Sequence, residues 1–246
     1  MTVEKPLALF VSVAVLAGCG GPAAHVPSGS ARPFTEQRAA VRDGRASRIV
    51  ADSPLTDAEW ESLRGLVGLR ELVLRRGVAD DAKAEILATL PDLERLVLRE
   101  SPLSDAGFQA IARCRTLTHL NVPQAACTAV GLRTLRAVPT LRSLRIGGPN
   151  LAGREVGEAV ATLESLESLH LIDVAIGDAG LAAIAGLPGL RTLYLDGAGV
   201  SDEAWSRYFQ TNPDVHVHVD QAHHDRDPGR DHDGPAANAA STPEER

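Results

Sequence analysis

The sequence predicts an α/β solenoid of about seven helix–strand units whose strands form one parallel sheet. First, the pattern LxxLxL, with Val or Ile in some last positions, recurs six times at intervals of 24 or 25 residues. Second, each copy follows a stretch with helical spacing of apolar residues, and the core composition is aliphatic, because aromatic residues are only 3% of the chain. Units of this length cannot bury their own apolar faces, so neighbouring units must stack around one continuous core. The six copies are Leu69/Leu72/Leu74, Leu93/Leu96/Leu98, Leu117/Leu120/Val122, Leu141/Leu144/Ile146, Leu166/Leu169/Leu171 and Leu190/Leu193/Leu195.

Residues 1–18 are predicted to be a signal peptide. Lys5 precedes an apolar run from Leu7 to Leu16, which is shorter than the roughly 20 residues of a membrane span but typical of a signal peptide. The tetrad LAGC that ends the run at Cys19 resembles the lipobox of bacterial lipoproteins. This resemblance implies cleavage before Cys19 and a lipid on its thiol. An ordinary secretory signal followed by a chance cysteine is the alternative.

Two segments are expected before the repeats. Residues 19–33 are rich in Gly, Pro, Ala and Ser and predict a flexible tether. Residues 34–54 have weak repeat character, with Ile49 and Val50 about 24 residues before the next strand pattern. Because terminal repeats depart from the consensus where one face meets water, this segment is predicted to be an N-terminal cap.

Residues 55–219 are predicted to form the solenoid itself. Thr56 and Glu59 have the spacing of a capping box. The single 25-residue interval predicts one extra residue, which we place in a longer helical turn between Val156 and Val160. Prolines between helix and strand, such as Pro139, mark the ends of helices. Helices are predicted to begin near Thr56, Asp80, Ser104, Thr128, Gly153, Asp178 and Ser201.

Residues 55–219, about two-thirds of the chain, resemble the leucine-rich repeat family, and especially its bacterial lipoprotein members. The clearest unit is IGDAGLAAIAGLPGLRTLYL, residues 176–195. The resemblance implies a sheet on the inner, concave face with helices outside. The family's common asparagine after LxxLxL is missing, so we expect direct backbone pairing in the turns. Its place is taken by Gly77, Ser101, Ala125, Pro149, Val174 and Ala198.

Two cysteines within the repeats are predicted to be core residues. Cys114 and Cys127 each fall in a column of apolar residues from successive units. A disulfide between them is not expected, because a strand of about six residues at about 3.3 Å per residue separates their columns.

Polar residues follow the strands on the predicted concave face. The x positions of LxxLxL should face outward and lie side by side in neighbouring strands. The central x positions predict a protein-binding row at Asn121, Arg145, His170 and Tyr194, flanked by Arg99 and Arg142. The alternative is a solvated sheet in which pairs such as Arg70 with Glu94 stabilise neighbouring strands.

The solenoid is predicted to end at Val219. Valine and histidine alternate in residues 215–219, which predicts a strand with His216 and His218 on one face. Residues 220–246 are polar and are expected to be a disordered His/Asp-rich tail. Imidazoles suit Zn, Ni or Cu, and a flexible tail would bind them weakly. The candidate metal ligands are His216, His218, His223, His224 and His232, and no other cofactor is expected.

The charge distribution and the lack of catalytic motifs argue against two classes of function, nucleic-acid binding and catalysis. Residues 211–246 hold eight acidic residues and three arginines, which account for −5 of the net charge of −7, so the repeats are nearly neutral and nucleic-acid binding is not predicted. No nucleophile elbow, phosphate loop or paired-carboxylate motif occurs, so catalysis is not expected. We therefore expect a monomeric lipoprotein, anchored on the outer side of a membrane of the bacterial cell envelope, that binds a protein partner. A metal-binding envelope protein and a structural envelope component are the alternatives.

Overall fold

The computed structural model describes residues 32–224 and residue 226. The predicted signal peptide, Cys19, most of the tether and His232 lie outside the described residues. The helices are α1 Phe34–Arg42, α2 Asp57–Leu63, α3 Asp81–Leu87, α4 Asp105–Ile111, α5 Ala129–Thr134, α6 Arg154–Ala161, α7 Gly177–Ile184 and α8 Asp202–Thr211. A 3₁₀ turn, Leu135–Ala137, extends α5. The strands are β1 Arg48–Ala51, β2 Glu71–Leu74, β3 Arg95–Leu98, β4 His119–Val122, β5 Ser143–Gly147, β6 Ser168–Ile172, β7 Thr192–Leu195, β8 His216–Val219 and β9 Ala222–His223.

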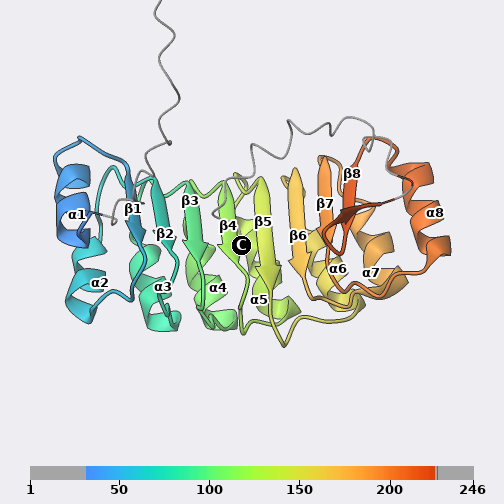
Figure 1. Cartoon of the computed structure of the whole chain (residues 1–246), viewed down its shortest axis with the longest axis horizontal. Helices are drawn as coiled ribbons and strands as arrows, with labels where there is room; N and C mark the ends of the chain where they lie inside the picture. The colour runs from blue at the N-terminus through green and yellow to red at the C-terminus, as the bar shows by residue number, and fades with distance from the viewer. Residues whose placement is uncertain (1–31, 225, 227–246) are drawn as a thin grey trace, which may run out of the picture. The chain divides into compact units, whose positions relative to one another are not determined.

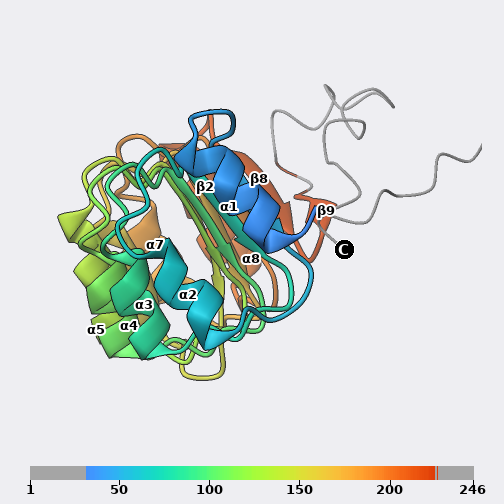
Figure 2. The same ribbon diagram turned by 90° about the vertical axis from the view of Figure 1, so that its left-hand side faces the viewer.

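The nine strands form one sheet in chain order, β1 to β9 (Figure 1). Strands β1 to β8 are parallel, and β9 pairs with β8 in the antiparallel direction. Helices α2, α3, α4, α5 and α7 lie together on one side of the sheet (Figure 2). The predicted α/β leucine-rich repeat solenoid is therefore confirmed. We call the sheet face opposite these helices the open face.

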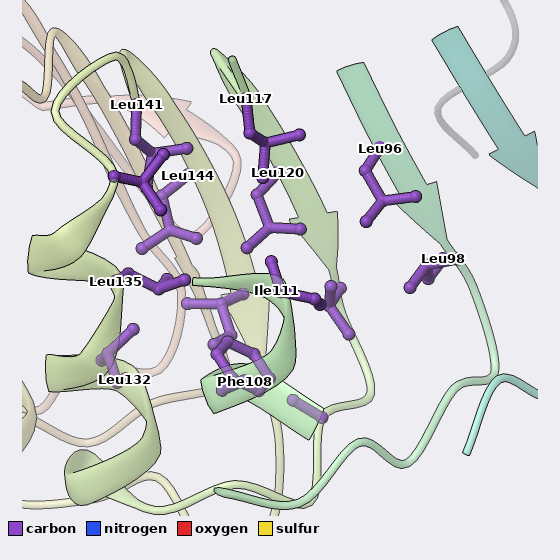
Figure 3. Packing of buried hydrophobic residues seen from close by; sticks show 14 of the residues in the cluster. Leu96, Leu98, Phe108, Ile111, Leu117, Leu120, Leu132, Leu135, Leu141 and Leu144 are labelled. Atoms are coloured by element: carbon purple, nitrogen blue, oxygen red, sulfur yellow. The ribbon is translucent and has the colours of Figure 1, made fainter. Parts of the chain in front are cut away.

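The core lies between the sheet and the helices. Side chains alternate along each strand, so the leucines of LxxLxL point toward the helices while the residues between them point to the open face. Leu96 and Leu120 on neighbouring strands are 0% and 1% exposed, and Phe108 and Leu132 from α4 and α5 are fully buried against this layer (Figure 3). Each unit thus contributes equivalent aliphatic side chains to one uninterrupted core.

The helices begin at or next to the predicted residues, and one placement is corrected. Thr56 and Glu59 form the predicted capping box. Helix α7 begins at Gly177, next to the predicted Asp178. The predicted position of the extra residue, inside α6, was wrong. Thr128 directly precedes α5 and Gly153 directly precedes α6, and these two residues are already 25 positions apart. The additional residue therefore lies in the connection before α6.

The turns after the strands lack an asparagine ladder and pair backbone groups between units, as predicted. The Ala125 N–H donates to Gly147 O at 2.8 Å, and the Gly177 N–H donates to Ala198 O at 2.9 Å. Some turns also use side chains, and the turn after β3 does so with a buried one. The Ser101 hydroxyl is fully buried, donates to Gly77 O at 2.6 Å and accepts from the Ala79 N–H at 3.1 Å. Ser101 therefore serves the turn backbone that an asparagine would otherwise serve.

Both edges of the sheet carry additional structure. At β1, the Gln37 amide from α1 donates to Val50 O and accepts from Val50 N–H, both at 2.8 Å, and so imitates a neighbouring strand residue. At the other edge, the predicted end of structure at Val219 was wrong. Asp220 and Gln221 have φ of 48° and 67° and form the two-residue turn of a β8–β9 hairpin.

Cys114 and Cys127 are buried and free, as the sequence predicted. Burial raises the pKa of the Cys114 thiol to about 11 and that of Cys127 to about 12. Both groups are therefore neutral core side chains near neutral pH. Among residues 32–224, no helix has the length and apolarity that crossing a bilayer requires.

Candidate binding surface on the open face

The four residues predicted for the central row lie side by side. Asn121 pairs with Arg145 in the register of β4 and β5, Arg145 with His170 in that of β5 and β6, and His170 with Tyr194 in that of β6 and β7. All four side chains are half-buried. The sheet continues this row in both directions, and the complete central row is Val50, Val73, Val97, Asn121, Arg145, His170, Tyr194 and His218.

A second row of polar side chains runs beside the central row, two residues earlier in each strand. Its N-terminal part carries charge and its C-terminal part carries small hydroxyl side chains before it ends at His216. Partial burial, and then the nearby Arg95 charge, lower the pKa of His119 in this row. The row consists of Arg48, Glu71, Arg95, His119, Ser143, Ser168, Thr192 and His216.

Ion pairs organise the N-terminal part of the open face. Arg70 bonds Glu94 at 3.0 Å, as predicted, and Glu71 lies between Arg48 at 3.1 Å and Arg95 at 3.3 Å. Exposed pairs of this kind contribute about 0–1 kcal/mol each, so they mainly fix side-chain positions. In the N-terminal part of the open face, Arg/Glu pairs therefore stabilise neighbouring strands, as the alternative interpretation expected.

The two flanking arginines of the predicted site lie at opposite ends of the strands. Arg142 immediately precedes β5, is 53% exposed and pairs with Glu167 at 3.4 Å. Arg99 immediately follows β3 and lines an open hollow of about 370 Å³. The hollow is lined by Asp52, Arg75, Arg76, Arg99, Glu100 and Gln124. Arg99 is therefore part of a separate, arginine-rich area beyond the carboxyl ends of β2 and β3.

The C-terminal part of the open face holds a connected cluster of aromatic and polar side chains. The ring of Tyr194 lies between His170, with centroids 5.2 Å apart, and His218, at 4.4 Å and an interplanar angle of 22°. His170 Nε2 lies 2.8 Å from Asp196 Oδ2, and these side chains are only 16% and 13% exposed. Gln221 donates to the same Asp196 oxygen at 2.7 Å. The cluster links three units of the solenoid and the terminal hairpin.

The β8–β9 hairpin brings three of the predicted metal-binding histidines together and directs a fourth elsewhere. His216, His218 and His223 come together, with ligand nitrogens all within 4.8 Å of one another. The His224 ring instead packs against Trp205 at 4.8 Å and Phe209 at 4.9 Å. His224 therefore belongs to the aromatic cover of α8 rather than to the three-histidine group.

Comparison with known proteins supports the fold. No family model and no curated protein matches the chain. Among solved structures, the chain is similar to an internalin C2 from Listeria monocytogenes, with 21% identity, a TM-score of 0.50, and 64% of both chains covered. It is also similar to an internalin from the same organism, with 16% identity, a TM-score of 0.43, and 76% of this chain and 64% of that chain covered. The chain thus spans slightly less than two-thirds of either internalin. These internalins are leucine-rich repeat proteins, and the first similarity agrees with the fold described above.

Proposed function

We propose that this leucine-rich repeat solenoid binds a protein partner through the open face, with Asn121, Arg145, His170 and Tyr194 at the centre of the contact. The observation that supports this is their unbroken register across β4 to β7. Tyrosine and arginine are the residue types most enriched at the energetic centres of protein interfaces. A continuous polar and aromatic strip on a rigid sheet is therefore suited to recognition.

Two side chains of the strip, His170 and Tyr194, are also held in place before a partner arrives. Asp196 fixes the His170 ring, and Tyr194 is confined between two imidazoles. These two side chains have little conformational entropy left to lose on binding, which favours affinity for a given contact area. Arg145 beside Asn121 gives the centre hydrogen-bond donors, so we expect a partner surface with acidic or hydrogen-bond-accepting groups.

In-cell photo-crosslinking tests this function. A photoreactive residue at position 192, next to the strip in the second row, should give a discrete adduct with a partner, and Arg145→Ala in the same chain should reduce that adduct about tenfold or more. A photoreactive residue at position 109, on the exposed side of α4, is the control. Equal adducts from both positions, or an adduct from 192 that Arg145→Ala leaves unchanged, would remove the open face from consideration. An adduct of twice the mass of the chain would indicate self-association and a structural role.

We also propose that the solenoid is anchored through Cys19 to a membrane of the bacterial cell envelope, on the side away from the cytoplasm. The support is the LAGC tetrad at the end of an apolar run of signal-peptide length. Metabolic labelling with a fatty acid should label the wild-type chain, and Cys19→Ser should abolish the label and the processing of the precursor. Label that persists in Cys19→Ser would contradict the anchor.

A further inference from the structure

The terminal hairpin gathers three imidazoles on the open face. Val217 is fully buried on the core side of β8, so its neighbours His216 and His218 point the other way. The two-residue turn then places His223 of β9 directly opposite His218 (Figure 2 labels both strands). Because facing residues of an antiparallel pair share one face, all three rings lie on the same side of the sheet.

The three rings are close enough to share one ligand. Their centroids are 4.6 Å apart for His216 and His218, 4.9 Å for His216 and His223, and 4.1 Å for His218 and His223. His216 Nε2 lies 2.8 Å from His218 Nε2. At this distance one ring donates its N–H to the nitrogen of the other, and a metal ion that replaces this proton would bind both nitrogens.

We propose that His216, His218 and His223 form a binding site for one divalent transition-metal ion of the Zn, Ni or Cu class. Tetrahedral Zn with Zn–N bonds of about 2.0–2.1 Å places ligand nitrogens about 3.4 Å apart. The ligand nitrogens here all lie within 4.8 Å of one another. Small ring rotations therefore convert the present arrangement into a three-nitrogen metal site.

The surroundings hold the ligands in place. Gln221 of the turn donates to Asp196 at 2.7 Å, and Asp220 accepts from the Gly197 N–H at 2.8 Å, so both turn residues are bonded to the loop after β7. Tyr194 stacks on the His218 ring. A site on a hairpin fixed in this way loses less conformational entropy on binding than the same histidines in an unstructured segment.

Three protein nitrogens leave one position of a tetrahedral ion open. All three histidines are half-buried, so an ion can reach them from solvent. The open position points to the face on which we place the protein partner, and a water molecule or a partner side chain can occupy it. The site does not depend on that partner, since its three ligands come from one chain.

Isothermal titration calorimetry of the full-length chain with ZnCl₂ tests the site. The expected result is one ion per chain, with binding weakened about tenfold or more in each of His216→Ala, His218→Ala and His223→Ala. His119→Ala, on the same face, and His224→Ala, on the same hairpin, should leave binding unchanged, and so should Arg145→Ala from the proposed protein-binding strip. Thermal unfolding supplies a second readout: ZnCl₂ should raise the Tm of the wild type and of His119→Ala but not that of the three ligand variants.

Two results would overturn the proposal. One is stoichiometric binding that survives all three ligand substitutions but is lost in His232→Ala, which would assign the metal to the tail. The other is binding by the wild type no tighter than by His218→Ala, with circular dichroism showing both chains folded. Replacement by Co²⁺ gives an independent check, because tetrahedral nitrogen ligation produces visible absorption bands, which should be absent in His218→Ala.

Discussion

The carboxylate of Asp105 binds Thr128 one unit further along the chain: Oδ1 accepts from the Thr128 N–H at 2.7 Å and Oδ2 accepts from its hydroxyl at 2.9 Å. Asp81 binds Ser104 in the same way, and Asp178 binds Ser201. Each aspartate is at the start of one helix and holds the residue that caps the next. These three pairs of neighbouring helices are thus joined by hydrogen bonds of the aspartate side chains as well as by the apolar core.

Asp105→Ala should lower the free energy of unfolding by about 1–2 kcal/mol, because the Thr128 and Gly131 N–H groups both lose their acceptor. Urea denaturation measures the change. Asp202→Ala is the matched control, since Asp202 begins the last helix and has no following helix in the described solenoid. An equal loss in both variants would mean that the effect comes from the charge at the helix start rather than from the link between units.

Gly131→Ala should destabilise the fold by about 1–3 kcal/mol. A β-carbon at this position would lie 2.4 Å from Asp105 Oδ1 and 2.8 Å from Asp105 Cα, so the link between α4 and α5 would have to open. Gly186→Ala is the control, because its nearest neighbour would be Ala183 O at 3.4 Å. Thermal unfolding of the two variants should separate clearly, and equal Tm values would show that α4 and α5 can move apart at little cost.

Acid should weaken the solenoid through Asp178. The backbone N–H of Ser201, and then its hydroxyl, hold the pKa of this carboxyl below the ordinary 3.8. A folded pKa below the unfolded one stabilises the fold at pH values above the unfolded pKa, and this contribution is lost as the pH falls through the folded pKa. Urea midpoints from neutral pH to about pH 2 should therefore fall less steeply for Asp178→Asn than for the wild type. Identical slopes would show that the carboxyl titrates alike in both states.

The two core cysteines should resist thiol reagents while the chain is folded. With pKa values raised by burial to about 11 and about 12, very little thiolate is present near neutral pH. In a Cys19→Ser background, Cys114 and Cys127 should react at least about 100-fold more slowly without denaturant than with it. Rapid reaction of one thiol in the native chain would reveal local opening of its unit.

Sequence periodicity predicted the fold and the central row because both follow from repeated spacing. Once Leu96, Leu120 and Leu144 are assigned to the core, alternation puts Val97, Asn121 and Arg145 on the open face in register. The buried state of the two repeat cysteines followed from the same columns.

Features that depend on contacts between distant segments were missed. Ser104 was predicted only as the start of a helix, whereas its neighbour Asp105 also bonds to the next unit. β9 has only two residues and no apolar pattern from which a strand could be predicted. As a result, the sequence could not distinguish His223, which faces His218, from His224, which packs on α8. It also could not identify Asp196 as the partner of both His170 and Gln221.

Gln37 at one edge of the sheet and strand β9 at the other limit the addition of further strands. The unpaired N–H and C=O groups of an exposed edge strand are a template for pairing with a strand of another copy, which leads to aggregation. Here Gln37 occupies the Val50 backbone groups at one edge, and β9 runs antiparallel along the other, where a further parallel unit would have to dock. Addition of another copy end to end would require displacing one of these pieces, so both edges of the described sheet are protected against pairing with a second copy.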